Sequence, residues 1–135
     1  MIKQTHVFRV KPGQELMAEV LKYCHQNNIT SGIVLGIIGS ATGARLNYLT
    51  ELPGKFQGES YQGPLEIVSA QGTIALKGKE TIVHIHAMLS TPQRCFGGHL
   101  VEATVFSTAE VAIAELTTPL TRYADSQTGL NELLR

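Results

Sequence analysis

Apolar residues change their period near residue 28, which separates a predicted helical part of the chain from a predicted strand part. Between about Gln14 and Gln26, apolar side chains recur at i, i+3, i+4 and i+7, the spacing of a helix with one buried stripe. These side chains are Met17, Val20, Leu21 and Cys24. A first strand is predicted before the helix, over Thr5–Val10, and Lys11-Pro12-Gly13 ends it. The pattern therefore predicts a helix that covers one face of a sheet.

Most of the chain after Asn28 has the pattern of β-strands. Residues Ile33–Ile38 are apolar on both faces, as in a central strand, whereas Ala44–Tyr48 alternates between apolar and polar positions. Thr50–Gly63 is predicted to be a long loop. Further strands are predicted over residues 65–76, 81–90, 99–107 and 110–116.

The tail after Pro119 is polar until Leu130, Leu133 and Leu134, which predict a short docking helix. One helix followed by many strands favours an α+β fold. We expect a largely antiparallel (mixed) β-sheet of about seven strands, with one main N-terminal helix and a short C-terminal helix. The 135 residues have the length of one domain, spanning residues 1–135.

Charge and cysteine content narrow the functional classes. Eleven basic residues balance eleven acidic ones, whereas a protein that binds DNA mainly by neutralising phosphates has a basic excess. Cys24 and Cys95 lie far apart and form neither a disulfide framework nor a paired metal motif, which favours a reducing cytosol. The N-terminus lacks the apolar stretch of a secretory signal, and the longest apolar run, Ile33–Gly39, is too short to cross a bilayer. We therefore expect a cytoplasmic protein with no membrane partner.

Two histidines, His84 and His86, lie within a predicted strand. Because alternate strand residues share a face, both imidazoles point away from the mostly apolar face that contains Val83 and Ile85. A pair at i and i+2 can reach one metal ion, but such pairs also occur by chance on polar strand faces. The position of a third histidine, His99, decides between these interpretations.

A β-turn predicted at Thr91-Pro92-Gln93-Arg94 sets the register between this strand and the next. With Pro92 and Gln93 at the tip, directly opposed residues share a face, so the histidines gather on one side and apolar side chains on the other. The predicted pairs are Ser90–Cys95, Leu89–Phe96, Ala87–Gly98 and His86–His99. A slip of one residue would break both groupings. The same register places Glu102 on the apolar side, which the pattern does not explain.

Three neutral imidazoles with an open fourth position match a zinc site that keeps a water or a substrate. Iron, nickel and manganese are compatible with the same ligand type. Gly97 and Gly98 precede His99 and either leave room beside it or allow close strand packing. The sequence thus predicts a divalent metal, with Zn²⁺ as the first choice, on His84, His86 and His99.

At these residues the sequence resembles the PPC (plants-and-prokaryotes conserved) domain family, over nearly the whole chain. The resemblance implies an antiparallel-rich α+β domain that assembles as a homotrimer, with a metal on the three histidines in prokaryotic members. The fold and the histidine motif are also similar to acetolactate decarboxylase, a longer enzyme from which only that motif carries over. The similar segments are Gly63–Ser69, His84-Ile85-His86, Gly97-Gly98-His99-Leu100, Thr128-Gly129-Leu130 and Glu132-Leu133.

Three functions follow from these observations. The first is a homotrimeric metal-binding protein that recognises a small-molecule ligand or a partner at the histidines. The second is a DNA-binding or regulatory protein, although the sequence lacks the Arg-Gly-Arg-Pro AT-hook that precedes this domain in plants. The third is a zinc-dependent lyase or hydrolase, for which the sequence places no acid or base beside the metal.

Other charged residues are weaker candidates for a functional site than the three histidines. Glu66 lies in a family-like segment and could contribute a carboxylate to a pocket or a subunit contact, or be a buried acid bound by backbone amides. Arg45, Arg94 and Arg122 could each bind an anion, but single arginines are most often solvated.

Overall fold

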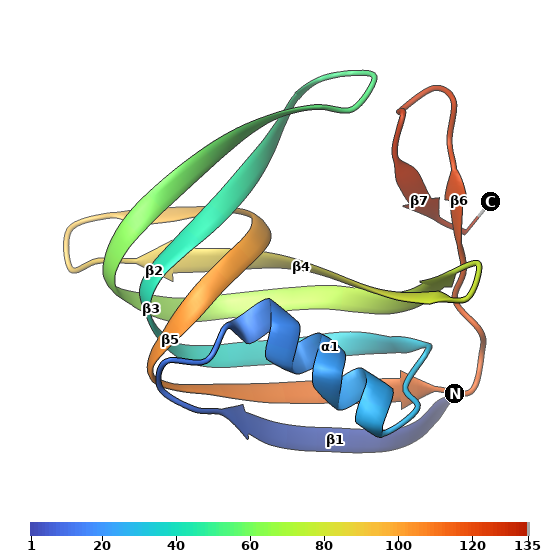
Figure 1. Cartoon of the computed structure of the whole chain (residues 1–135), viewed down its shortest axis with the longest axis horizontal. Helices are drawn as coiled ribbons and strands as arrows, with labels where there is room; N and C mark the ends of the chain where they lie inside the picture. The colour runs from blue at the N-terminus through green and yellow to red at the C-terminus, as the bar shows by residue number, and fades with distance from the viewer. Residues whose placement is uncertain (135) are drawn as a thin grey trace.

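The computed structural model describes residues 1–134 of the chain. Its elements, in chain order, are β1 (Ile2–Val10), α1 (Leu16–Gln26), β2 (Gly32–Glu51), β3 (Lys55–Lys77), β4 (Glu80–Ser90), β5 (Cys95–Leu116), β6 (Arg122–Ala124) and β7 (Asn131–Leu133) (Figure 1). Within this range, no helix has the length and apolar character needed to cross a bilayer.

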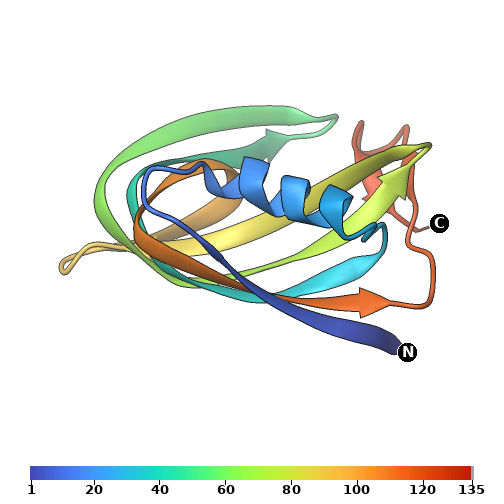
Figure 2. The ribbon, with the colours of Figure 1, turned by 60° about the horizontal axis from the view of Figure 1, so that its bottom comes forward.

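Five strands form one sheet in the order β1-β5-β2-β3-β4, and β6 and β7 form a separate two-stranded sheet. Every strand pair is antiparallel, and the parallel pairing found within residues 1–134 is one isolated bridge between Leu76 and Thr121. Because β5 pairs with both β2 and β4, the sheet closes on itself. Figure 2 shows the strong curvature of β2, β3 and β5 that this closure requires. The predicted α+β class and the number of strands are confirmed.

Helix α1 lies across one face of the sheet (Figure 1) and buries Leu16, Val20 and Cys24 in the core. The Glu15 carboxylate caps its N-terminus by accepting hydrogen bonds from the N–H groups of the next turn, at 2.8 and 2.9 Å. It also accepts from the Ala103 N–H of β5 at 3.1 Å, so the cap ties the helix to the sheet. The predicted N-terminal helix is confirmed, with its start at Leu16.

The long loop predicted over Thr50–Gly63 is wrong, because β2 and β3 continue through this segment as a long hairpin. Leu49 pairs with Phe56 near the turn, and the hydroxyl groups of Tyr48 and Tyr61 are hydrogen-bonded across the hairpin at 2.8 Å. Most side chains at the start of β3 are exposed. The polar composition of the segment therefore belongs to a solvated pair of strands.

The short C-terminal helix predicted around Leu130 is also wrong, because this segment forms the β6–β7 hairpin. The Asp125 carboxylate accepts hydrogen bonds from the N–H groups of Gln127 and Thr128, at 2.8 and 2.9 Å, in a turn that reverses the chain. Gly129 completes the turn at a φ of +70°, a conformation that glycine adopts without strain. These local bonds replace the helical ones that the leucine spacing suggested.

A bulge in β5 places Glu102 outside the core. Leu46 of β2 lies opposite Leu100, whereas the preceding residue, Arg45, lies opposite Glu102, so Val101 is an extra residue in β5. Both Val101 and Glu102 are exposed. The predicted position of Glu102 on the apolar side is therefore wrong, because the register shifts by one residue just before it.

We expect Gly72→Ala to lower the free energy of unfolding by about 1–3 kcal/mol, the usual cost of overpacking. Gly72 lies in β3, and a Cβ added there would overlap the backbone oxygen of His84 in β4. Gly36→Ala in β2 is the matched control, because a Cβ at that position meets no heavy atom within 4 Å. Urea unfolding of both variants measures the difference, and equal stabilities would contradict the close approach of β3 and β4.

Candidate metal centre

The turn between β4 and β5 sets the register of the strands that hold the histidines. The Thr91 N–H donates to the Arg94 carbonyl at 2.9 Å, and Thr91 Oγ1 accepts from the N–H groups of Gln93 and Arg94. The predicted register is confirmed. The pairs are Ser90–Cys95, Leu89–Phe96, Met88–Gly97, Ala87–Gly98 and His86–His99.

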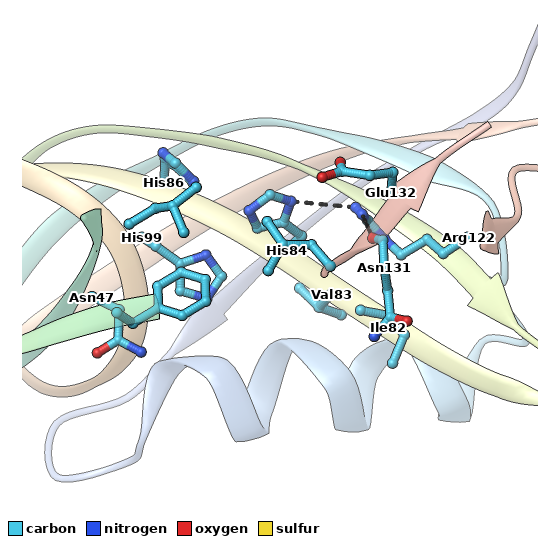
Figure 3. Close-up of a pocket in the computed structure, with 12 residues that line it drawn as sticks. Asn47, Ile82, Val83, His84, His86, His99, Arg122, Asn131 and Glu132 are labelled. Atoms are coloured by element: carbon cyan, nitrogen blue, oxygen red, sulfur yellow. Dashed lines mark hydrogen bonds between the residues drawn. The ribbon is translucent and has the colours of Figure 1, made fainter. Parts of the chain in front are cut away.

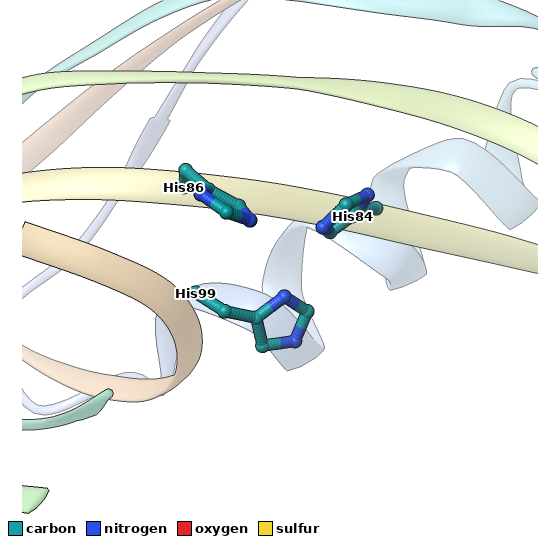
Figure 4. A group of neighbouring side chains, drawn as sticks. All are labelled: His84, His86 and His99. Carbon is teal, nitrogen blue, oxygen red and sulfur yellow. The ribbon is translucent and has the colours of Figure 1, made fainter. Parts of the chain in front are cut away.

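His84 and His86 from β4 and His99 from β5 form a compact cluster (Figure 4). The ring centroids are 5.0 Å apart for His84 and His86, 4.9 Å for His84 and His99, and 5.5 Å for His86 and His99. One ring nitrogen of each residue lies within 4.8 Å of the other two. Since Zn²⁺ binds imidazole nitrogens at about 2.0–2.1 Å, modest side-chain rotation brings all three to ligand distance. The side chains thus fit a three-histidine metal site.

A cavity of about 400 Å³ adjoins this cluster (Figure 3). The tip of the β2–β3 hairpin and the C-terminal hairpin form two of its walls, and the Gly54 N–H joins them by donating to the Thr128 carbonyl at 2.8 Å. The apolar lining consists of Leu49, Phe56, Ile82, Val83 and Leu130. The polar lining, besides the histidines, consists of Asn47, Arg122, Asn131 and Glu132.

Arg122 is the buried cation of this cavity, with 8% of its surface exposed. Its Nη1 donates to the Asn131 carbonyl at 3.0 Å, and its Nη2 donates to Thr73 Oγ1 at 2.7 Å. Nη2 also donates to His84 Nδ1 at 3.3 Å, the contact drawn in Figure 3. The guanidinium therefore links the C-terminal hairpin to β3 and to one of the three histidines.

Burial and nearby positive charge favour the neutral form of His84 and His99. The pKa of His84 falls from 6.5 to about 4, chiefly because burial disfavours the charged ring, with smaller effects from His99, Arg122 and His86. Burial is also the main reason for the lowered pKa of His99. Burial lowers the pKa of Arg122, and the Glu132 carboxylate opposes that shift. Because an imidazole must be neutral to bind a metal, the lowered pKa values keep His84 and His99 available as ligands below pH 6.5.

Glu66, Gly97 and Gly98, which the sequence also singled out, lie apart from the cavity lining. Glu66 is exposed and lies opposite Ser90 in the β3–β4 pairing. The residue of β3 opposite His86 is Gln71, so Glu66 lies farther along the strand, away from the histidines. A Cβ on Gly97 would come within 2.9 Å of the Ala87 carbonyl oxygen, and a Cβ on Gly98 within 3.0 Å of the Tyr48 ring. The two glycines therefore serve close strand packing.

The C-terminal hairpin contributes site residues that sequence reasoning did not place. In the sequence, Arg122 is one of three single arginines that could bind an anion, and no motif predicts Asn131 or Glu132 beside the histidines. The signal available in the sequence was the Asp125–Gly129 turn, because Asp, Thr and Gly at these spacings favour a tight reversal. Recognising that turn would have predicted a hairpin, but not the strands on which it docks.

Comparison with known proteins agrees with this fold. The family model described as the Plants and Prokaryotes Conserved (PCC) domain matches residues 1–117. The chain is 30% identical over 133 residues to a bifunctional protein GlmU of Synechococcus sp. (strain JA-3-3Ab), covering 96% of this chain and 20% of that protein. The chain thus spans about a fifth of the length of the curated relatives it matches.

Two solved structures are similar over nearly their whole length. The metal-containing protein AF0104 from Archaeoglobus fulgidus has a TM-score of 0.92 and 26% identity, covering 100% of this chain and 96% of that chain. A plant- and prokaryote-conserved (PPC) protein from Pyrococcus horikoshii has a TM-score of 0.87 and 28% identity, covering 100% and 95%.

More distant neighbours show the fold alone. A Bacteroides thetaiotaomicron structure described as that of a candidate DNA-binding protein has a TM-score of 0.91 at 18% identity, covering 98% of this chain and 93% of that chain. A Staphylococcus aureus protein described as similar to alpha-acetolactate decarboxylase has a TM-score of 0.56 at 15% identity, covering 90% and 55%. The family match over residues 1–117 decides the classification: the chain belongs to the Plants and Prokaryotes Conserved (PPC) domain family.

Proposed function

We propose that this protein binds a divalent metal, with Zn²⁺ as the first choice, through His84, His86 and His99. The observation that carries the proposal is the approach of one nitrogen from each imidazole to within 4.8 Å of the other two, beside a cavity. The similarity to a metal-containing protein of Archaeoglobus fulgidus supports it. The lowered pKa values of His84 and His99 support it as well, since both rings are held neutral, as metal ligation requires.

The cavity beside the histidines supports binding of a small-molecule ligand. Three protein ligands leave an open coordination position for such a molecule, as in sites that bind substrates. A mostly apolar cavity with a few convergent polar groups is the usual form of a small-molecule site. One observation supports a lyase or hydrolase function. The Glu132 carboxylate lines the same cavity, which provides a group of the kind that acts as an acid or a base in such reactions. A bound metal would supply polarisation of a carbonyl or activation of water.

We also propose that the protein is a cytoplasmic homotrimer. Large apolar side chains that alternate with buried residues point away from the core on β1, β2, β3 and β5, and a monomer exposes them to water. These are Val7, Ile38, Val68 and Phe106, with 75%, 56%, 51% and 52% of their surface exposed. The free thiols of Cys24 and Cys95 are compatible with a reducing compartment.

Binding to duplex DNA has less support than metal binding. Eleven basic residues balance eleven acidic ones, so the protein has no net positive charge to attract phosphates. Of the arginines considered for anion binding, Arg122 is buried beside the histidines rather than presented to a nucleic acid.

Replacing any one of His84, His86 or His99 with Ala should remove most of the bound metal, because two imidazoles hold a divalent ion far less tightly than three. Elemental analysis of the purified, tag-free proteins measures metal content, and a thermal melt checks that each variant is folded. His25→Ala is the control, since His25 is exposed near the end of α1 and outside the cluster. Unchanged metal content in His86→Ala and His99→Ala would refute the site.

Metal should be retained below pH 6.5 and released as the pH approaches about 4, where His84 gains a proton. The sign follows from competition at one nitrogen: a lowered pKa means that protons displace the metal only at lower pH. Dialysis against metal-free buffers at stepped pH values, followed by elemental analysis, gives the release midpoint. A midpoint at or above pH 6.5 would contradict the buried environment of His84.

Sedimentation velocity at micromolar concentration should show a species of three times the chain mass. Phe106→Asp should shift the distribution toward monomer, because it places a charge in the exposed apolar face of β5. Glu110→Asp is the control on the same strand, at an exposed position that already carries a carboxylate. A wild-type protein that sediments as a monomer would refute the trimer.

A further inference from the structure

The burial of Arg122 beside three histidines calls for a compensating negative charge. Arg122 is 8% exposed, and within residues 1–134 its Nε atom is buried without a hydrogen-bond partner. The one carboxylate that lines the cavity in the described chain is that of Glu132. Three neutral imidazoles bring no charge, so a divalent ion together with Arg122 leaves this partly apolar cavity with a net positive charge. Buried charges of this kind are normally paired.

The hydrogen bond between Arg122 and His84 fixes the tautomer of the imidazole. A guanidinium group has donors and no acceptor, so His84 Nδ1 must accept from Nη2 at 3.3 Å. Neutral His84 then carries its hydrogen on Nε2, the nitrogen on the side of His86 and His99 (Figure 4). For Nε2 to become a ligand, that hydrogen must move to Nδ1, where it would face the N–H of Arg122. Ligation by Nε2 and the Arg122–His84 hydrogen bond therefore exclude each other.

Loss of that hydrogen bond leaves a buried donor of Arg122 beside the metal site. An unsatisfied buried donor is costly, and a charged one more so, which favours an acceptor brought by a ligand. A carboxylate suits this role, because a guanidinium binds it with two parallel N–H donors. Leu49, Phe56, Ile82, Val83 and Leu130 line the rest of the cavity and match an apolar body better than a phosphate.

We propose that Arg122 is an anion-recognition residue, and that the site binds a small carboxylate with an apolar body cooperatively with the metal. This inference rests on the proposed metal function. Arg122 receives the carboxylate only after His84 has become a ligand, so metal and carboxylate strengthen each other's binding. By linkage, the factor by which each ligand strengthens the other is the same.

The test is calorimetric titration of Zn²⁺ into metal-free protein, with isobutyrate as the probe carboxylate. Isobutyrate should strengthen Zn²⁺ binding by about tenfold, within the usual range of coupling between sites. Isobutyramide, a neutral molecule of the same shape, should have no effect, and inorganic phosphate should have a smaller one. Replacing Zn²⁺ with Co²⁺ adds a second readout, since the Co²⁺ absorption spectrum should change with isobutyrate and not with isobutyramide.

Variants at residue 122 separate recognition from a structural role. Arg122→Met should bind Zn²⁺ at least as tightly as wild type without isobutyrate, because it lacks both the charge and the donor to His84. It should lose the enhancement by isobutyrate, whereas Arg122→Lys should keep part of it. Arg45→Met is the control, because Arg45 is exposed on β2 and outside the lining of this cavity. Circular dichroism melts verify folding. If Arg122→Met is unfolded, the size of the isobutyrate enhancement in Arg122→Lys tests whether Arg122 recognises the carboxylate.

Three outcomes would overturn the inference while the metal function stands. These are an equal effect of isobutyrate and isobutyramide, an equal or larger effect of phosphate, and full enhancement by isobutyrate in every folded Arg122 variant. Failure of wild-type protein to bind Zn²⁺ or Co²⁺ at all would overturn the proposed function, and this inference with it.

Discussion

The sharing of β5 between β2 and β4 is the constraint on which the site depends. Over Cys95–His99, β5 pairs with β4, and from His99 onward it pairs with β2. His99 lies at the point where both pairings meet, opposite His86 on one side and Asn47 on the other. Because side chains alternate along a strand, this double pairing leaves His99 one orientation, toward the two histidines of β4. The cluster is thus a consequence of sheet closure.

Features that depend on residues close together in the sequence could be predicted from the sequence alone. The Thr91–Arg94 turn has its own hydrogen bonds, so its residues alone predict the β4–β5 register and the meeting of His86 with His99. Helix α1 was predictable for the same reason, since its cap and apolar stripe lie within one segment. The bulge at Val101 was not, because it depends on the pairing of β5 with Arg45 and Leu46, more than fifty residues earlier in the chain.

The C-terminal hairpin shows the limit of reasoning from a single sequence most clearly. Arg122 is buried because it reaches Thr73 and His84, which lie 49 and 38 positions away. An isolated arginine between Thr121 and Tyr123 gives no sign of such contacts, and the usual expectation is a solvated side chain. The histidine triad could therefore be predicted from strand alternation and one turn, whereas the residues that set the charge of the cavity could not.

The charge of Arg122 acts in two opposite ways on the same nitrogen atoms. It disfavours protonation of His84 and His99, which keeps their lone pairs free for a metal. It also repels the metal, and Coulomb repulsion scales with charge, so a divalent ion is disfavoured about twice as much as a proton. Burial has the larger effect on the pKa of both rings, and the charge of Arg122 adds to it. Arg122 alone would therefore weaken metal binding as well as histidine protonation, and the site would bind the metal no more tightly for having it. Glu132 supplies the one carboxylate in the described lining of this cavity, and a second carboxylate held by Arg122 would offset more of the repulsion between the guanidinium and the metal. For that reason we propose that the metal and the ligand's carboxylate bind together.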